Sequence, residues 1–166
     1  MKSLFLVRHA KSSWDDARLS DFDRPLNERG EKDAPRMGEL LKKRGTEPDL
    51  IYSSPALRAL TTAKIIGGVL GYPENKIQTD RQLYHSDEER LLTFLRNIPD
   101  SNNGIMLFGH NPGLTEFANE LFKESIGNIP TAGIVTGQLI INSWKEAKPG
   151  CGKLLFFDFP KNLKRD

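Results

Sequence analysis

Short apolar runs alternate with longer amphipathic stretches along most of this chain. Three runs of bulky apolar residues are too short for helices and predict buried strands, at 3–7, 50–52 and 104–108. Four stretches repeat apolar residues at helical spacing and predict helices, at 27–44, 55–70, 87–97 and 114–122. Strands that alternate with helices indicate an α/β fold, in which helices cover both faces of a mostly parallel sheet.

The C-terminal part of the sequence departs from this alternation. A weak strand is expected at 76–79, and two further strands are expected at 134–142 and 153–159 with no helix between them. Strands that are joined without a crossover helix pair antiparallel, so we expect a hairpin at one edge of the sheet. The pattern contains no repeat and no long linker, and a length of 166 residues predicts a single domain over 1–166.

The expected second helix has a well-marked start. Ser53 and Ser54 precede Pro55, and serine at the cap with proline at the first helical position is typical of a helix start. Helical spacing from that start predicts an inward-facing side formed by Leu57, Leu60, Ala63, Ile66 and Leu70.

Composition favours a soluble protein over a membrane or nucleic-acid-binding one. The 24 basic and 22 acidic residues give a formal net charge of +2, whereas nucleic-acid-binding domains usually carry a clear basic excess. No apolar stretch reaches the roughly 18 residues of a membrane-spanning helix. Neither a nucleic acid nor a membrane is therefore expected as a partner, and the oligomeric state is left open.

Cysteine content and the start of the chain bear on the cellular compartment. Cys151 is the single cysteine, so it cannot form an internal disulfide or a multi-cysteine zinc site. The apolar run near the start covers only residues 4–7, which is shorter than the core of a secretory signal. These features predict a reducing, cytoplasmic environment.

Residues that can carry chemistry follow the ends of the predicted strands. Arg8 and His9 follow the first strand, Arg58 lies in the first turn of the helix after the second strand, and the third strand runs into His110. Ligands of open α/β sheets bind outside the carboxyl ends of the strands. If these strands are parallel neighbours, two histidines and two arginines converge on one crevice.

This group of side chains suits a phosphoryl ligand. Guanidinium groups offer planar forks of N–H donors that match phosphate oxygens, and the start of the helix after Ser54 adds free backbone N–H groups. A free histidine has a pKa of about 6.5. Neighbouring positive charge should lower the pKa of His9 and keep its ring neutral and nucleophilic.

Four ordered segments resemble the histidine phosphatase superfamily, which shares the fold of phosphoglycerate mutase. Segment 6–14 (LVRHAKSSW) contains an Arg-His pair followed by alanine, where the family usually has glycine, and its Lys-Ser-Ser-Trp resembles the SixA-type phosphohistidine phosphatases. Segments 24–30 (RPLNERG), 53–63 (SSPALRALTTA) and 109–114 (GHNPGL) follow in the order and spacing of the family. The resemblance implies a three-layer α/β/α fold with a mostly parallel central sheet, in a minimal version without a large cap.

The resemblance also implies a role for individual residues. His9 would be the nucleophile that becomes transiently phosphorylated, Arg8 and Arg58 would hold the phosphoryl oxygens, and His110 would donate a hydrogen bond to the same group. Two further residues are predicted to bind substrate, Ser12 and Asn111. Neither a metal nor a cofactor is expected, and the implied partner is a phosphorylated substrate.

One departure from the family pattern bears on the substrate. Many superfamily members carry a Glu or Asp general acid in the stretch that corresponds to 80–86 (DRQLYHS), where only Asp80 and Asp87 flank the expected place. Alkoxide leaving groups need a proton more than the imidazole of phosphohistidine does. The missing acid therefore favours phosphohistidine carried on a protein, and the short chain, which leaves no stretch for a lid, favours an open site.

Three alternatives stay open at this point. The chain could be a small-molecule phosphomonoesterase or a mutase, or it could be a phospholigand-binding module without turnover. A metal-dependent hydrolase would need His9, His85 and His110 together, although the spacing of these histidines is not of the usual metal-binding kind. His85 alone is a weak candidate, because a lone histidine in a polar stretch is more often solvated.

Overall fold

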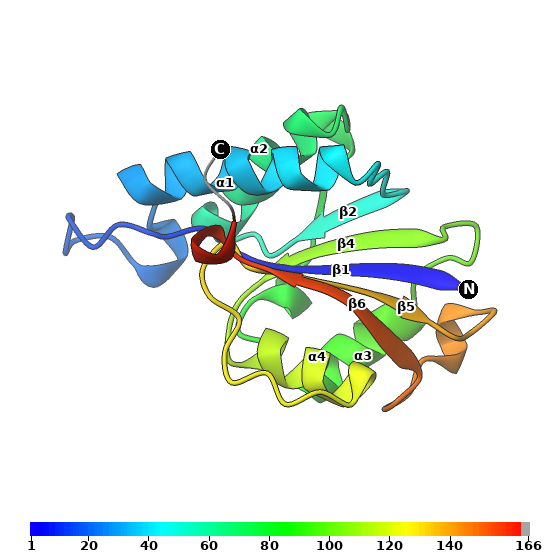
Figure 1. Ribbon diagram of the computed structural model, residues 1–166. Helices are drawn as coiled ribbons and strands as arrows, with labels where there is room; N and C mark the ends of the chain where they lie inside the picture. Colours follow the sequence, from blue (N-terminus) through cyan, green and yellow to red (C-terminus); the bar gives the residue numbers. More distant parts are fainter. Residues whose placement is uncertain (164–166) are drawn as a thin grey trace.

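The computed structural model describes residues 1–163, in which a six-stranded sheet lies between two layers of helices (Figure 1). The strands are β1 Lys2–Arg8, β2 Leu50–Ser53, β3 Gln78–Thr79, β4 Gly104–Gly109, β5 Ile134–Leu139 and β6 Gly152–Asp158. The helices are α1 Glu28–Lys43, α2 Leu57–Val69, α3 Glu88–Arg96 and α4 Gly113–Phe122. Short 3-10 helices lie at Asp21–Asp23, Glu74–Lys76, Arg81–Leu83, Trp144–Glu146 and Pro160–Asn162.

The sheet has the strand order β3-β2-β4-β1-β5-β6. Strands β1 and β2 both pair parallel with β4, and β3 pairs parallel with β2. Strand β5 pairs antiparallel with β1, and β6 pairs antiparallel with β5. The predicted α/β class and the antiparallel edge hairpin are both confirmed, and β1, β4 and β2 are the parallel neighbours that the predicted site requires.

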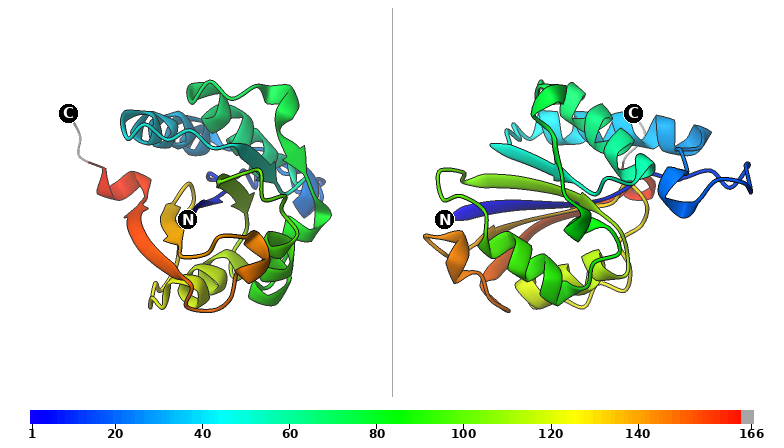
Figure 2. Two further views of the ribbon diagram at one scale, coloured as in Figure 1. Left: turned by 90° about the vertical axis from the view of Figure 1, so that its right-hand side faces the viewer. Right: turned by 180° about the vertical axis from the view of Figure 1, so that it is seen from behind.

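Helices cover the two faces of the sheet in pairs. Helices α1 and α2 lie on one face, and α3 and α4 lie on the other (Figures 1 and 2). Strand β4 is buried along its whole length because both of its faces pack against helices, and its sequence is therefore a continuous apolar run. One core contains Met37, Ile66 and Phe108, and the other contains Leu95, Ile105, Phe117 and Trp144.

The start of the second helix is where the sequence prediction was wrong. The backbone N–H of Ser54 donates to the carbonyl of Phe108 at 2.9 Å, which holds Ser54 extended beside β4. Helix α2 therefore begins at Leu57, and Ala56 caps it without a side-chain hydrogen bond. With this start, Arg58 faces inward, and Leu57, predicted to face inward, is 42% exposed.

Two glycines allow the loops around the carboxyl ends of the strands to approach helices closely. A Cβ on Gly113, at the start of α4, would overlap the carbonyl oxygen of Ser86. A Cβ on Gly30, in the first turn of α1, would overlap the carbonyl oxygen of Lys11. Both positions thus require glycine for steric reasons, and both fix loops that border the site described below.

None of the helices within residues 1–163 combines the length and the apolar character that are needed to cross a bilayer.

Candidate functional site

A pocket of about 240 Å³ lies at the carboxyl ends of β1, β4 and β2. Its lining comprises Arg8, His9, Lys11, Ser12, Trp14, Arg24, Arg58, His85, His110, Asn111 and Thr131. The two histidines and two arginines expected to converge therefore line one pocket, because their strands are parallel neighbours and their side chains follow the strand ends.

His9 lies immediately after β1 and is only 7% exposed. Its Nδ1 lies 2.8 Å from the carbonyl oxygen of Ala10, and since a carbonyl can only accept, Nδ1 carries the proton. The Nε2 lone pair is then free for nucleophilic attack. Thr62 holds this turn, because its Oγ1 accepts from the N–H of Ala10 at 3.0 Å and donates to the carbonyl of Arg58 at 2.7 Å.

His110 is held in the opposite tautomer. Its Nδ1 lies 3.3 Å from Nη2 of Arg58, and a guanidinium can only donate, so Nδ1 accepts. Its Nε2 therefore carries the proton of the neutral ring and donates to Oγ of Ser54 at 2.8 Å. The His9 and His110 rings are tilted, with their centroids 5.2 Å apart.

Arg8 offers an unused donor. Its Nη1 donates to the carbonyl of Ile129 at 2.9 Å, which fixes the direction of the guanidinium. Its Nε is buried and has no hydrogen-bond partner among the described residues. A buried donor without a partner is costly, and a bound oxyanion in the pocket would supply the missing acceptor.

Asp21 joins the two other arginines of the pocket. Arg58 donates to the Asp21 carbonyl at 2.6 Å and to its Oδ2 at 3.0 Å, and Arg24 donates to its Oδ1 at 3.1 Å. Tyr84 Oη donates to Oδ2 at 2.6 Å. Burial opposes ionisation of Asp21, but the hydrogen bonds from Tyr84 and Arg58 outweigh it and hold the pKa of the carboxyl group far below its ordinary value.

Ser12 and Asn111, the two predicted substrate-binding residues, both line the pocket. Ser12 Oγ accepts from Nη2 of Arg24, which leaves its hydroxyl proton available to a ligand. The Asn111 amide donates to the Asn128 side chain and to the Ile129 carbonyl, both at 2.9 Å, and its oxygen accepts from Thr115. Asn111 thus ties the following loop to α4, and its contact with substrate stays a prediction.

Burial is the main reason why both histidines are neutral. It lowers the pKa of His9 to about 4, with smaller contributions from the charges of Arg58, Arg8 and Arg24 and partial compensation by the hydrogen bond to Ala10. Burial also lowers the pKa of His110 to about 3, assisted by His9 and Arg58. The sequence analysis predicted correctly that the pKa of His9 is lowered. It attributed this shift to neighbouring charges, whereas desolvation is the larger cause.

These low pKa values predict an acid-sensitive fold. The rings are neutral in the folded chain, whereas histidines of the unfolded chain protonate near pH 6.5, so the unfolded state binds more protons between about pH 6.5 and 4. The free energy of unfolding should therefore be highest above about pH 6.5. Between about pH 6.5 and 4, each ring should lower it by about 1.4 kcal/mol for every unit by which the pH falls. Ring-carbon NMR titration with parallel urea denaturation checks this, and titration of both rings near pH 6.5 would contradict it.

Among the described residues that line the pocket there is no carboxylate. Asp21 is not part of that lining although it binds two of its arginines, and its low pKa keeps it ionised and unable to donate a proton. His85 is 58% exposed and lies 3.3 Å from Asp21 Oδ2. Within residues 1–163, no three His, Cys, Asp or Glu side chains are grouped so that they could hold one metal ion, so the geometry gives no support to the metal-dependent alternative.

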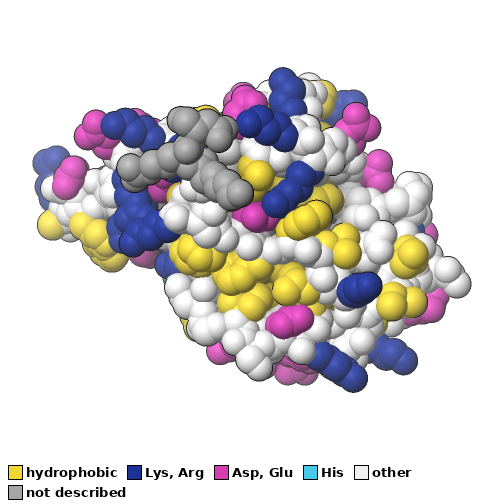
Figure 3. Space-filling model, viewed as in Figure 1, with side chains coloured by type: hydrophobic (Ala, Val, Ile, Leu, Met, Phe, Trp, Pro, Cys, Tyr) yellow, Lys and Arg dark blue, Asp and Glu magenta, His cyan; other side chains and the backbone are white. Residues whose placement is uncertain are grey.

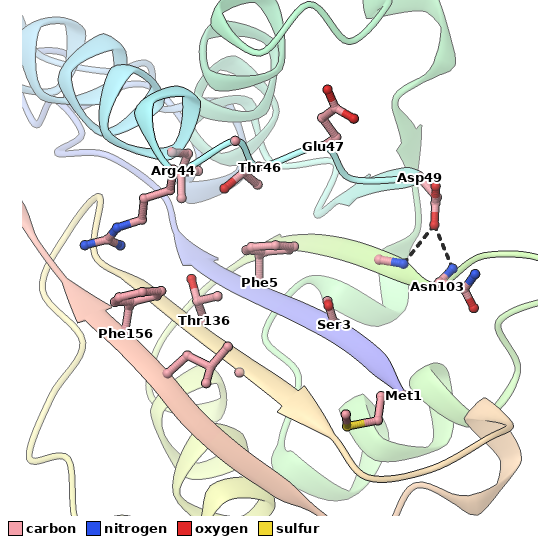
Figure 4. Close-up of a pocket in the computed structure, with 15 residues that line it drawn as sticks. Met1, Ser3, Phe5, Arg44, Thr46, Glu47, Asp49, Asn103, Thr136 and Phe156 are labelled. Atoms are coloured by element: carbon pink, nitrogen blue, oxygen red, sulfur yellow. Dashed lines mark hydrogen bonds between the residues drawn. The ribbon is translucent and has the colours of Figure 1, made fainter.

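A larger cavity of about 420 Å³ lies at the opposite end of the sheet, where β1 and β4 begin (Figure 4). Phe5 and Phe156 contribute its apolar walls, and Asp49 accepts hydrogen bonds from the backbone N–H groups of Asn103 and Gly104 at 2.7 and 2.9 Å. No histidine or cysteine belongs to its described lining. Pocket volume therefore does not identify the reactive site. The histidines and arginines that line the smaller pocket identify it.

Sequence reasoning missed several residues of this site. Asp21 and Tyr84 gave no recognisable pattern, because Asp21 lies in a three-residue 3-10 helix, Tyr84 directly follows another one, and both contact the site only through the fold. Arg24 is the first residue of the segment 24–30 that resembles the family, and this resemblance was the signal that could have identified it as a site residue. Ser54 and Thr62 lie in another such segment, near Arg58, but their hydrogen bonds to the histidine turns depend on how α2 packs against the sheet.

Comparison with known proteins agrees with this geometry. The model of the histidine phosphatase superfamily, branch 1, matches residues 4–87. An uncharacterized chloroplastic protein of Arabidopsis thaliana is 37% identical over 155 residues, which make up 88% of this chain and 70% of that protein.

Two solved structures resemble the whole fold. A protein from Agrobacterium tumefaciens named SixA is 27% identical, with a TM-score of 0.81 and coverage of 96% of this chain and 98% of that one. The protein histidine phosphatase SixA complexed with tungstate is 24% identical, with a TM-score of 0.83 and coverage of 98% and 99%. The fold is thus the minimal, SixA-like version of the phosphoglycerate mutase fold, and the chain belongs to branch 1 of the histidine phosphatase superfamily.

Proposed function

We propose that this chain is a phosphohistidine phosphatase that works through a covalent phosphohistidine on His9. The observation that carries the proposal is the state of His9, a neutral ring whose Nδ1–H is held by Ala10 while Nε2 is free in a pocket lined by three arginines and two further histidines. A nucleophile oriented through its other ring nitrogen beside preorganised donors is what phosphoryl transfer requires.

The reaction has two steps. In the first, Nε2 of His9 attacks phosphorus and the P–N bond of the substrate breaks, with its electron pair staying on the leaving imidazole nitrogen. A substrate ring that is protonated on its other nitrogen then leaves as neutral imidazole. In the second step, water attacks phosphorus, the bond to His9 breaks, and phosphate and a proton are released.

The surrounding donors stabilise the charge that builds up on the phosphoryl oxygens. Arg8 Nε is a buried donor without a partner among the described residues, and Arg58 is already oriented by Asp21. The phosphoryl dianion would also raise the pKa of His110, which burial and neighbouring cations depress, so that Nδ1 gains a proton and donates to the phosphoryl group. Ser54 accepts from Nε2 and keeps the ring in position meanwhile.

The substrate class follows from the leaving group. The described lining contains no carboxyl group that could protonate an alkoxide, and the carboxylate of Asp21, which binds Arg58 and Arg24, stays ionised. Imidazole leaves without such an acid, so a phosphoramidate fits the site better than an alkyl ester. The likeness to SixA, which is described as a protein histidine phosphatase and binds the oxyanion tungstate, supports the same substrate class here.

We therefore expect free phosphohistidine to be hydrolysed with a kcat/KM at least about 100-fold above that of glycerol phosphate, since general acids typically contribute 10²- to 10⁴-fold. Phosphate release from equal concentrations of the two substrates measures this. An aryl phosphate, whose leaving group needs little protonation, serves as a control for the integrity of the pocket. A kcat/KM for glycerol phosphate equal to that for phosphohistidine would contradict the proposal.

A further inference from the structure

The most exposed large apolar side chain of the described residues borders the phosphate pocket. Trp14 is 74% exposed and forms part of the lining at the pocket mouth. Tryptophan is usually mostly buried in folded chains, and tryptophans at protein interfaces are frequent hot spots of binding. An indole left in solvent beside a reactive pocket therefore points to a contact with something outside this chain.

Trp14 is exposed and yet fixed in position. The guanidinium carbon of Arg24 lies 3.2 Å from the centroid of its ring. Arg24 itself is buried and donates to the carbonyl of Ser13 at 3.0 Å, and the N–H of Ser13 donates to Pro25 at 2.8 Å. The indole thus rests on an anchored side chain, and a partner would lose little entropy in ordering it.

The size of the pocket indicates what must lie over Trp14. A pocket of about 240 Å³ has room for a phosphoryl group and its imidazole. A protein that carries this imidazole must then lie across the rim. There, segment 11–20 projects from the body of the molecule and exposes hydrophobic side chains (Figures 1 and 3).

The charge of this projecting segment favours apolar recognition. Lys11 and Arg18 balance Asp15 and Asp16, and Arg18 is paired with Asp16 at 3.0 Å. Leu19, which is 39% exposed, adds a second apolar side chain. The segment therefore offers an apolar contact with little net charge, which suits the surface of a folded protein.

We propose that Trp14 is a specificity-determining residue that docks the protein carrying the phosphohistidine. The proposal rests on the proposed function and adds to it the surface by which a protein substrate is distinguished from a free one. Trp14 takes no part in the phosphoryl transfer, so its contribution should depend on the carrier and be small for the free amino acid with the same leaving group.

The test compares Trp14→Ala with the wild type on two substrates, free phosphohistidine and a folded protein domain phosphorylated on histidine. We expect kcat/KM for the protein to fall at least about tenfold more than kcat/KM for the free amino acid, as loss of an interface tryptophan typically costs that much. Trp14→Phe should restore most of the activity on the protein. Ile140→Ala, which removes a 69% exposed side chain at the opposite end of the sheet, is the matched control and should change neither value.

The possible outcomes separate this inference from the proposed function. Equal losses on both substrates, or no loss on either, would overturn the docking role while leaving phosphohistidine hydrolysis intact. A wild type that hydrolyses the aryl phosphate but neither form of phosphohistidine would overturn both. A loss confined to the protein substrate and reversed by phenylalanine would support the docking role.

Discussion

His9→Ala is expected to lower phosphatase activity by roughly four to six orders of magnitude, the range in which removal of an enzyme nucleophile typically falls. The ring of His110 is not available in its place, because its Nε2 is bound to Ser54 and its Nδ1 accepts from Arg58. Steady-state hydrolysis of phosphohistidine and of an aryl phosphate measures the loss. Acid-stable and acid-labile phosphate on the quenched protein should also be compared, since a phosphohistidine is acid-labile and should be missing from the variant.

His85→Ala provides the matched control for this experiment. His85 also borders the pocket but is 58% exposed, and its ring lies near Asp21, Tyr84 and His110 rather than against His9. This variant should keep most of the activity and the acid-labile phosphate. Hydrolysis by His9→Ala at a level near that of the wild type would refute a covalent intermediate on His9.

Arg58→Ala is expected to lower kcat/KM by about 100- to 1,000-fold, as for removal of a preorganised donor elsewhere. Arg58 is 4% exposed and contacts both Asp21 and His110, so its loss removes a phosphoryl donor and also frees His110 Nδ1. Its charge is one of the causes that lower the pKa of His9. The acid limb of the pH–activity profile should therefore move to higher pH in the variant.

Two companion variants make this result specific. Arg58→Lys keeps the positive charge but loses the planar fork, so it should restore the pH profile more than the rate. Arg18→Ala removes an arginine whose side chain is 90% exposed, and its kinetics should match the wild type. Activity of Arg58→Ala within a few-fold of the wild type would contradict the role of this residue in holding the phosphoryl group.

The elements that sequence patterns predicted well are those buried by local apolar runs. Strand β4 and helix α4 appeared near the expected residues, because an apolar run or a repeat of apolar residues is enough to bury them. The start of α2 was not predictable in this way. The hydrogen bond between Ser54 and Phe108 extends the strand, and it joins residues 54 apart in the sequence.

The same distinction applies to the site. Arg8, His9 and His110 could be predicted because they directly follow runs of apolar residues, and ligand sites of α/β sheets lie at the carboxyl ends of the strands that such runs form. Asp21 could not be predicted, since it lies in a short 3-10 helix and its carboxylate reaches Arg58, Arg24 and Tyr84 only through the tertiary fold. A helix of three residues is too short to show a periodicity from which the direction of a side chain could be inferred.

The sequence by itself determined the α/β class, the positions of the strands, and several of the residues that line the pocket, His9 and His110 among them, because burial of apolar runs and the ends of strands are local properties. Only the tertiary structure decided the tautomers of His9 and His110, the coupling of Arg58 to Asp21, and the support of Trp14 by Arg24. These features depend on distances between segments that are far apart in the chain. A hydrogen bond or a pKa shift changes when such a distance changes by a few ångströms.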